Sequence, residues 1–164
     1  MPLLLNSTYQ NVFYDFVLDS IRDVLIAEFN YGKIYIAPNV RYNDNFQIRI
    51  WGKSQEETDN LTGAEWQKEY SVEIVLIAID KNPGEEFYKR LYQDSERIYQ
   101  SLWNNFKGCY SKTITFGDDR SYEMILLNGI VSGIEYNIDE EDETIDGMHT
   151  AIIDFTVLVS REDN

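Results

Sequence analysis

Apolar and polar residues along this chain recur with the spacings of helices and strands, most clearly in the middle of the sequence. Residues 70–80 begin by alternating and become continuously apolar over residues 74–79, which is typical of a strand covered on both faces. A long amphipathic helix is predicted to follow, with Asn82 as its cap and Pro83 in its first turn. Its apolar stripe comprises Phe87, Leu91, Ile98 and Leu102.

The N-terminal part of the chain predicts another helix, two strands and a loop. The helix is expected over residues 7–30, where apolar side chains recur at spacings of three and four. This stripe consists of Phe13, Phe16, Val17, Ile21, Val24, Leu25 and Phe29. A short strand is predicted over residues 33–37, stopped by Pro38, and an alternating strand over residues 46–51. Because the polar residues 52–64 offer almost nothing to bury, we expect an extended loop there.

The C-terminal part predicts shorter apolar pieces followed by a hairpin. A short strand or turn is expected over residues 113–120, and another apolar piece over residues 122–128. Residues 129–138 and 150–161 then form a hairpin, whose second strand alternates between an apolar and a mixed face. An acidic tip at residues 139–146 joins the two strands.

These elements and the chain length together predict the fold class. The chain has 164 residues, and its 43% hydrophobic content is enough for one domain with its own core. We expect a single α+β domain over residues 1–164, with a mainly antiparallel β-sheet flanked by two long α-helices on one side. The expected order of elements is α-β-β-β-α-β-β.

Cysteine content and hydropathy bound the cellular setting. Cys109 is the single cysteine, which excludes an internal disulfide and a CxxC metal motif. The first residues lack the basic and apolar segments of a signal peptide, and no apolar run approaches the ~20 residues of a membrane span. We therefore expect synthesis in the cytoplasm and no membrane partner.

The charge of the chain is strongly negative and unevenly placed. A formal net charge of -15 and a pI near 4.3 argue against ordinary nucleic-acid binding, which needs lysine and arginine to replace phosphate counterions. Residues 121–160 hold nine acidic residues and no lysine or arginine. The densest group is the acidic tip, formed by Asp139, Glu140, Glu141, Asp142, Glu143 and Asp146. The simplest interpretation is a solvated face that aids solubility.

No complete set of catalytic or metal-binding residues emerges from the sequence. His149 is the single histidine, and at the start of a strand it is expected to be structural. No glycine-rich nucleotide motif occurs. Residues 142–147 imitate the start of an EF-hand loop, but Ile153 stands where calcium needs a bidentate glutamate. We expect no enzymatic activity, no cofactor and no specific metal site.

The order of elements, the size and the acidic balance resemble the tail terminator family of tailed bacteriophages, also called tail-completion or tail-to-head joining proteins. The resemblance rests on the long N-terminal helix leading into Lys-Ile-Tyr-Ile at residues 33–36, on the strand at residues 70–79 turning into the Asn82-Pro83 helix, and on the closing pair of strands. It implies a structural virion protein at the head-tail junction. Such a protein forms a homo-hexameric ring on the head-proximal end of the tail tube, stops tube growth and joins the tail to the head connector.

The resemblance also implies partners, namely other copies of the chain, the tail tube protein, a neck or connector protein, and duplex DNA that passes through the lumen without specific binding. A ring needs two different contact patches per subunit. Trp51, Tyr136 and Leu158 are candidate subunit contacts, because a single alternating core face leaves these apolar groups outside. The acidic tip would face the lumen or a partner. Two alternatives stay open: another neck component, such as a head-completion or stopper protein, and a non-viral soluble ligand-binding α+β domain.

Overall fold

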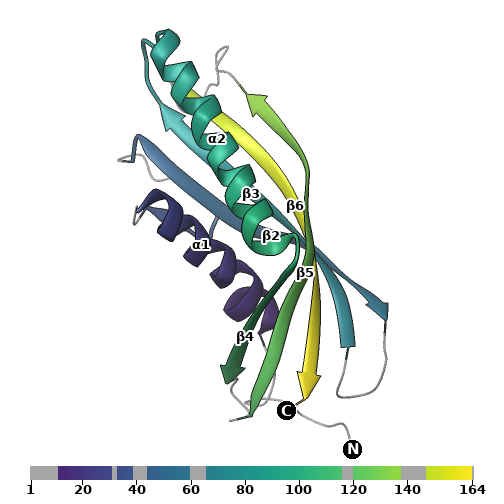
Figure 1. Cartoon of the computed structure of the whole chain (residues 1–164). Helices are drawn as coiled ribbons and strands as arrows, with labels where there is room; N and C mark the ends of the chain where they lie inside the picture. The colour runs from purple at the N-terminus through teal and green to yellow at the C-terminus, as the bar shows by residue number, and fades with distance from the viewer. Residues whose placement is uncertain are drawn as a thin grey trace, which may run out of the picture.

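A six-stranded sheet dominates the computed structural model, which describes residues 11–30, 33–38, 44–59, 66–115, 120–137 and 147–163 (Figure 1). The strands are β1 (Ile34–Tyr35), β2 (Phe46–Asp59), β3 (Trp66–Ile79), β4 (Cys109–Thr115), β5 (Ser121–Asn137) and β6 (Met148–Asp163). Their spatial order is β1-β2-β3-β6-β5-β4, with β1 parallel to β2 and every other pair antiparallel. The helical segments are the π-helical η1 (Phe13–Leu18), α1 (Asp19–Phe29) and α2 (Glu85–Phe106).

The core lies between one face of the sheet and the helices. Alternate residues of the central strands β3 and β6 are buried on this face, as the period of two along a strand requires. They are Tyr70, Val72, Ile74, Leu76, Ala151, Ile153, Phe155, Val157 and Val159. Figure 1 shows α2 lying across the sheet with α1 beside it, and the buried stripe of α2 includes the predicted Leu91, Ile98 and Leu102. The helices and the sheet share one apolar cluster.

Among the described residues, the second face of the sheet is buried at one end of β2 and β3 and at Thr150 of β6. Residues 74–78 of β3 are buried on both faces, as their continuous apolar run predicts. Beside them lies Arg49, whose side chain is 2% exposed. Two contacts compensate its burial: its Nε donates to Gln47 Oε1 at 2.8 Å, and its guanidinium carbon lies 4.4 Å from the centroid of the Tyr35 ring. The Tyr35 hydroxyl in turn donates to Asp44 at 2.9 Å. The polar residues that alternate with the apolar residues of β2 therefore belong to a buried polar cluster on this face, not to a solvated surface.

The predicted fold class is wrong in its balance and its order. Strands outweigh helices, and only α2, with 22 residues, is long, since the N-terminal helical segment consists of the six-residue η1 and the 11-residue α1. The sheet gains a strand, β4, at its edge, so the order is helix, three strands, helix, three strands. Only the end of this strand was predicted, as a short strand or turn over residues 113–120. An edge strand with few apolar side chains needs only its ladder and a half-buried face.

Residues 52–59 were expected in a loop but extend β2. They pair with β3 as far as the Asp59↔Gln67 position, with register shifts after Gly52 and after Glu57. The side chains of residues 52–58 are exposed, so their polarity resembled that of a loop. Backbone pairing with β3 stabilises this segment without any apolar side chain. The remaining residues 60–64 of the expected loop lie outside the described part of the chain.

Two other element boundaries also differ from the prediction. Helix α2 begins at Glu85 after the N-cap Gly84, and Asn82 instead donates its backbone N–H to Asp80 Oδ1 at 3.0 Å. Strand β5 joins two segments that were predicted separately, residues 122–128 and 129–138, into one strand with two register shifts, one after Leu127 and one after Val131. Asn82 therefore belongs to a turn that precedes the helix, and it does not cap the helix.

The end of α2 packs tightly on β5 at Gly129. A Cβ placed on Gly129 would lie 2.7 Å from Phe106 Cβ and 2.9 Å from the Phe106 carbonyl oxygen. The backbone of α2 therefore approaches the strand at a distance that only glycine permits. A Cβ placed on Gly133, farther along β5, would meet nothing within 4 Å.

We predict that Gly129→Ala lowers the free energy of unfolding by about 1–3 kcal/mol, because the added methyl group overpacks this contact. Gly133→Ala is the matched control in the same strand and is expected to change stability by less than about 0.5 kcal/mol. Urea unfolding followed by circular dichroism measures both. Equal midpoints for the two variants would contradict the close approach of α2 to β5.

Tyr70 places a phenol inside the core. Its side chain is 1% exposed, and its ring meets that of Phe13 edge to face at 4.8 Å between centroids. Burial raises the pKa of Tyr70 from 10.0 to about 12, since the phenolate loses its hydration in the core. The unfolded chain therefore releases this proton at a lower pH than the folded chain does.

We predict that the contribution of Tyr70 to stability is fully present below pH 10 and is lost as the pH rises through 12. Two pKa units correspond to about 2–3 kcal/mol. In Tyr70→Phe this loss is absent, while the other tyrosines and the lysines titrate as in the wild type. Denaturant unfolding of both proteins across this pH range measures the difference, and parallel stability curves would show that Tyr70 is not desolvated.

Candidate functional site

An apolar hollow of about 570 Å³ lies where the C-terminal end of α2 meets β5 and β6. It is lined by Glu69, Trp103, Lys107, Asn128, Gly129, Ile130, Thr156, Val157 and Leu158. We call Trp103, Lys107, Ile130 and Leu158 the bulge patch. Trp103 is 40% exposed and Ile130 is 58% exposed, so two large apolar side chains of this patch face solvent together. Such exposed apolar groups beside a hollow are typical of an interaction surface.

A bulge in β5 shapes this patch. Leu127 pairs with Leu158, and Ile130 pairs with Thr156. Two residues of β5, Asn128 and Gly129, therefore stand opposite the single residue Val157 of β6. Asn128 adopts the left-handed conformation, with a φ of 52°. Bulges of this kind redirect the side chains that follow them, here Ile130. The Asn-Gly pair inside an apolar run was the sequence signal that could have revealed the bulge.

A cation completes the bulge patch. Lys107 follows the last residue of α2, and its Nζ lies 3.8 Å from the centroid of the Trp103 ring. This arrangement is a cation–π contact. The patch therefore combines apolar area with one positive charge on a chain whose net charge is strongly negative. Sequence reasoning identified Leu158 alone among these residues.

The three predicted subunit contacts lie in different environments. Leu158 belongs to the bulge patch, and Trp51 is half-buried on β2, opposite Glu73 of β3. Tyr136 contacts α2 instead, because its hydroxyl lies 2.7 Å from Ser95 Oγ and its ring meets Tyr92 at 4.9 Å between centroids. The structure thus brings none of the three together, and the contacts of Tyr136 are within the molecule.

The acidic tip, residues 139–146, lies outside the described residues. The strands that flank it are paired, since Asn137 stands opposite Thr150. The carbonyl of Gly147 accepts a hydrogen bond from the backbone N–H of Asp80 at 3.0 Å. Asn137 and Gly147, the described residues that flank the tip, therefore lie at the end of the sheet from which the chain enters α2.

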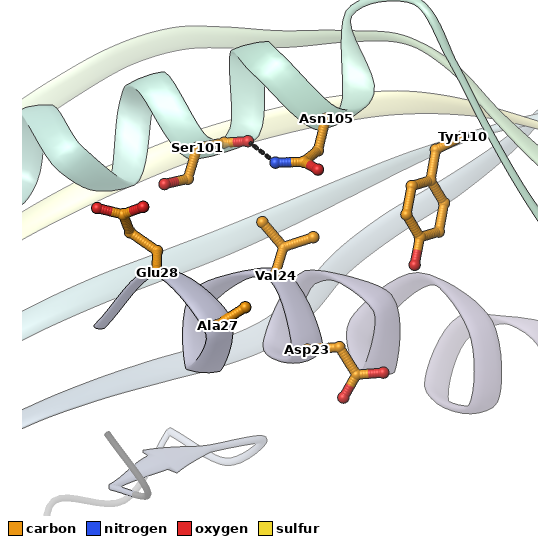
Figure 2. Close-up of a pocket in the computed structure, with 7 residues that line it drawn as sticks. All are labelled: Asp23, Val24, Ala27, Glu28, Ser101, Asn105 and Tyr110. Carbon is orange, nitrogen blue, oxygen red and sulfur yellow. Dashed lines mark hydrogen bonds between the residues drawn. The ribbon is translucent and has the colours of Figure 1, made fainter. Parts of the chain in front are cut away.

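A polar groove of about 340 Å³ lies between α1, α2 and β4. Figure 2 shows the side chains that line it. Asn105 donates to the Ser101 carbonyl at 2.8 Å, and Ser101 Oγ donates to the Arg97 carbonyl at 2.7 Å. Asp23 forms a 3.9 Å ion pair with Lys112. These groups satisfy helix carbonyls and neighbouring charges, so the groove presents no nucleophile beside a base.

An ion network joins the two helices along the groove. Arg97 contacts Glu28 Oε1 at 3.1 Å and Asp94 Oδ1 at 3.2 Å, and its guanidinium carbon lies 4.2 Å from the centroid of the Phe29 ring. Asp94 is 5% exposed and also lies 3.6 Å from Arg90. Arg97 therefore holds α1 against α2 through both charge and packing.

His149 and Cys109 lie in different environments in the described part of the chain. His149 is 2% exposed and packs edge to face against Phe87 and Tyr88, with centroids 5.0 and 5.5 Å apart. Cys109 is exposed at the start of β4. Among the described residues, no group of three or more His, Cys, Asp or Glu side chains is placed to hold a metal ion. Within the same residues, no helix has the length and apolar character to cross a membrane.

Comparison with known proteins finds a likeness in fold. No protein-family model matches the chain, and no curated protein matches its sequence. Among solved structures, the fold is similar to that of a chain described as "Virion of native gene transfer agent (GTA) particle", with a TM-score of 0.51 and 10% sequence identity. The match covers 89% of this chain and 99% of that chain. At this identity the likeness shows a shared fold over nearly the whole domain.

We predict that Arg97→Ala lowers the free energy of unfolding by about 1–2 kcal/mol, since it removes charged hydrogen bonds to both Glu28 and Asp94. Arg90→Ala is the control, because the Arg90 side chain is 77% exposed, lies 3.6 Å from Asp94 and is 5.9 Å from the centroid of the Phe46 ring; we expect a loss below about 0.5 kcal/mol. Thermal unfolding at low and high salt measures both. A larger loss for Arg90→Ala would contradict the role of Arg97 as the link between the helices.

Proposed function

We propose that this chain is a structural component of a phage-like particle, and specifically a tail terminator. In this role it forms a ring on the head-proximal end of the tail tube, stops tube growth and joins the tail to the head connector. The observation that carries the proposal is the fold likeness to a chain of a gene transfer agent virion, which extends over 89% of this chain and 99% of that one. A shared fold over both whole domains supports a shared structural role.

The surface of the domain is compatible with a ring. Head-to-tail closure needs two different patches on each subunit. Trp51 lies on β2 toward one side of the sheet, and the bulge patch adjoins β5 toward the other side. The bulge patch offers the exposed aromatic and aliphatic anchors that carry most of the energy in protein interfaces. These two regions are the candidate faces of the subunit contact.

The charge of the chain fits the passage of DNA through such a ring. Six copies at -15 each carry a total of -90. An acidic lumen repels the phosphate backbone within a screening length of about 8 Å, so duplex DNA passes without binding. The acidic tip is the candidate element for the lumen or for the neck partner, while the tail tube protein and the connector supply the axial contacts.

A second neck role draws on the same likeness. The similar virion chain supports membership in a particle without specifying which component this chain is. A head-completion or stopper protein is therefore the alternative, and it differs from a terminator in acting on the head side of the junction. Particle morphology separates the two roles.

We predict that particles assembled without this chain show filled heads beside separate tail tubes of excessive and uneven length, because tube growth then lacks a stop. Negative-stain electron microscopy of particles from a gene deletion measures tube lengths, and restoring the gene in trans is the control. Tails of normal length beside leaking heads would instead assign the chain to the head side. Intact virions would overturn any neck role.

A further inference from the structure

The outer edge of β5 has no strand partner over its C-terminal half within the described residues. Strand β4 covers β5 only as far as the Cys109↔Leu127 pair. Beyond the bulge at Asn128 and Gly129, residues 130–137 pair with β6 alone, with a second register shift after Val131. These eight residues contain no proline or lysine, and their single charge is Glu135. An edge that is long, rich in strand-forming residues and poorly protected by charge is a template for pairing with another chain.

The edge of β2 on the other side of the sheet is unpaired in a similar way, as far as the structure is described. Strand β1 pairs with β2 only at Ile48 and Arg49. Residues 52–59 pair with β3 alone and expose the side chains of residues 52–58. We call residues 52–59 the β2 arm. Like the unpaired part of β5, it contains eight residues and lacks proline. The two unpaired edges therefore match in length.

The two edges have complementary directions and positions. Because β2, β3, β6 and β5 are successively antiparallel, β5 runs opposite to β2. Two copies in the same orientation would therefore bring β5 of one and β2 of the next together as an antiparallel pair. The unpaired half of β5 lies toward the Asn137 end and that of β2 toward the Asp59 end, so the second copy must be shifted along the strands. A stagger of this kind is what tilted strands need when they close around an axis.

Charge and apolar area support the same pairing. The unpaired half of β5 begins at Ile130, within the bulge patch, next to the cation Lys107. The β2 arm carries the exposed acids Glu56 and Glu57. An arm laid along β5 would cover the apolar side chains of the patch and bring carboxylates toward its lysine.

We propose that a second copy of this chain adds its β2 arm, residues 52–59, to the unpaired edge of β5, residues 130–137, as an antiparallel strand. The interface is head-to-tail, since each copy offers one edge of each kind, and it continues from copy to copy until the ring closes. This pairing rests on the proposed ring and names the residues that build it. Backbone hydrogen bonds supply its register, and the bulge patch supplies its apolar anchor.

Disulfide trapping in the full-length chain tests the pairing. In a Cys109→Ser background, Glu135→Cys on β5 is combined in turn with Ser54→Cys, Gln55→Cys, Glu56→Cys and Glu57→Cys on the arm. All four arm positions and position 135 are exposed, so the substitutions leave the core unchanged. Stepping by one residue scans the register, because a disulfide needs Cα atoms within about 4.4–6.8 Å. We expect one or two combinations to give a ladder of covalent multimers under mild oxidation. Addition of a reductant is expected to convert these multimers back to monomers.

The controls separate the possible outcomes. Glu135→Cys combined with Glu96→Cys, on the exposed side of α2, reports random collision and is expected to stay monomeric on a denaturing gel. Covalent dimers from the single Glu135→Cys variant would mean that β5 pairs with itself, which overturns the head-to-tail interface. If native mass spectrometry finds a ring and no combination is trapped, the edge pairing is wrong while the ring stands. A chain that stays monomeric at high concentration would overturn the proposed ring itself.

Discussion

The structure depends on one constraint: the apolar face of the β3–β6 pair must be removed from water, and α2 is the element that covers it. A sheet buried on one face needs a helix whose apolar stripe is equally long, and α2, with 22 residues, supplies that stripe. Its last turn comes so close to β5 that Gly129 meets Phe106 without room for a methyl group. The position of α2 therefore sets where the core ends and where the bulge of β5 must lie.

The surface features follow from this limited coverage. Because α2 ends at Phe106 and the chain returns as the short β4, only the first half of β5 receives a second strand partner among the described residues. Beyond the bulge, Trp103 and Ile130 remain exposed around a hollow. On the other side of the sheet, β1 has only two residues, so most of β2 also lacks a second strand partner among the described residues. Within the described residues, one domain thus carries two different unpaired edges, and a head-to-tail contact needs two different surfaces of this kind on each subunit.

Several polar groups of the described residues, buried or half-buried, serve packing and helix docking. Arg97 joins Asp94 to Glu28 across the two helices, and Tyr136 meets Ser95 under α2. Arg49 is buried on the second face by Gln47 and the Tyr35 ring. Each of these groups has its charge or hydroxyl engaged by a neighbour, as groups withdrawn from water require.

The sequence by itself determined the elements with strong apolar periodicity. The stripe of α2, the doubly buried run of β3 and the alternating strand β6 could be predicted because burial selects side chains position by position. Leu158 was also recognised as an apolar group outside the core face. Tertiary structure alone decided the extension of β2 through polar residues 52–59, the start of β4 at Cys109 with its place at the sheet edge, and the gathering of Trp103, Lys107 and Ile130 around Leu158. The physical reason is that backbone pairing and long-range contact leave little trace in local side-chain pattern, since a strand edge is stabilised by its neighbour's N–H and C=O groups.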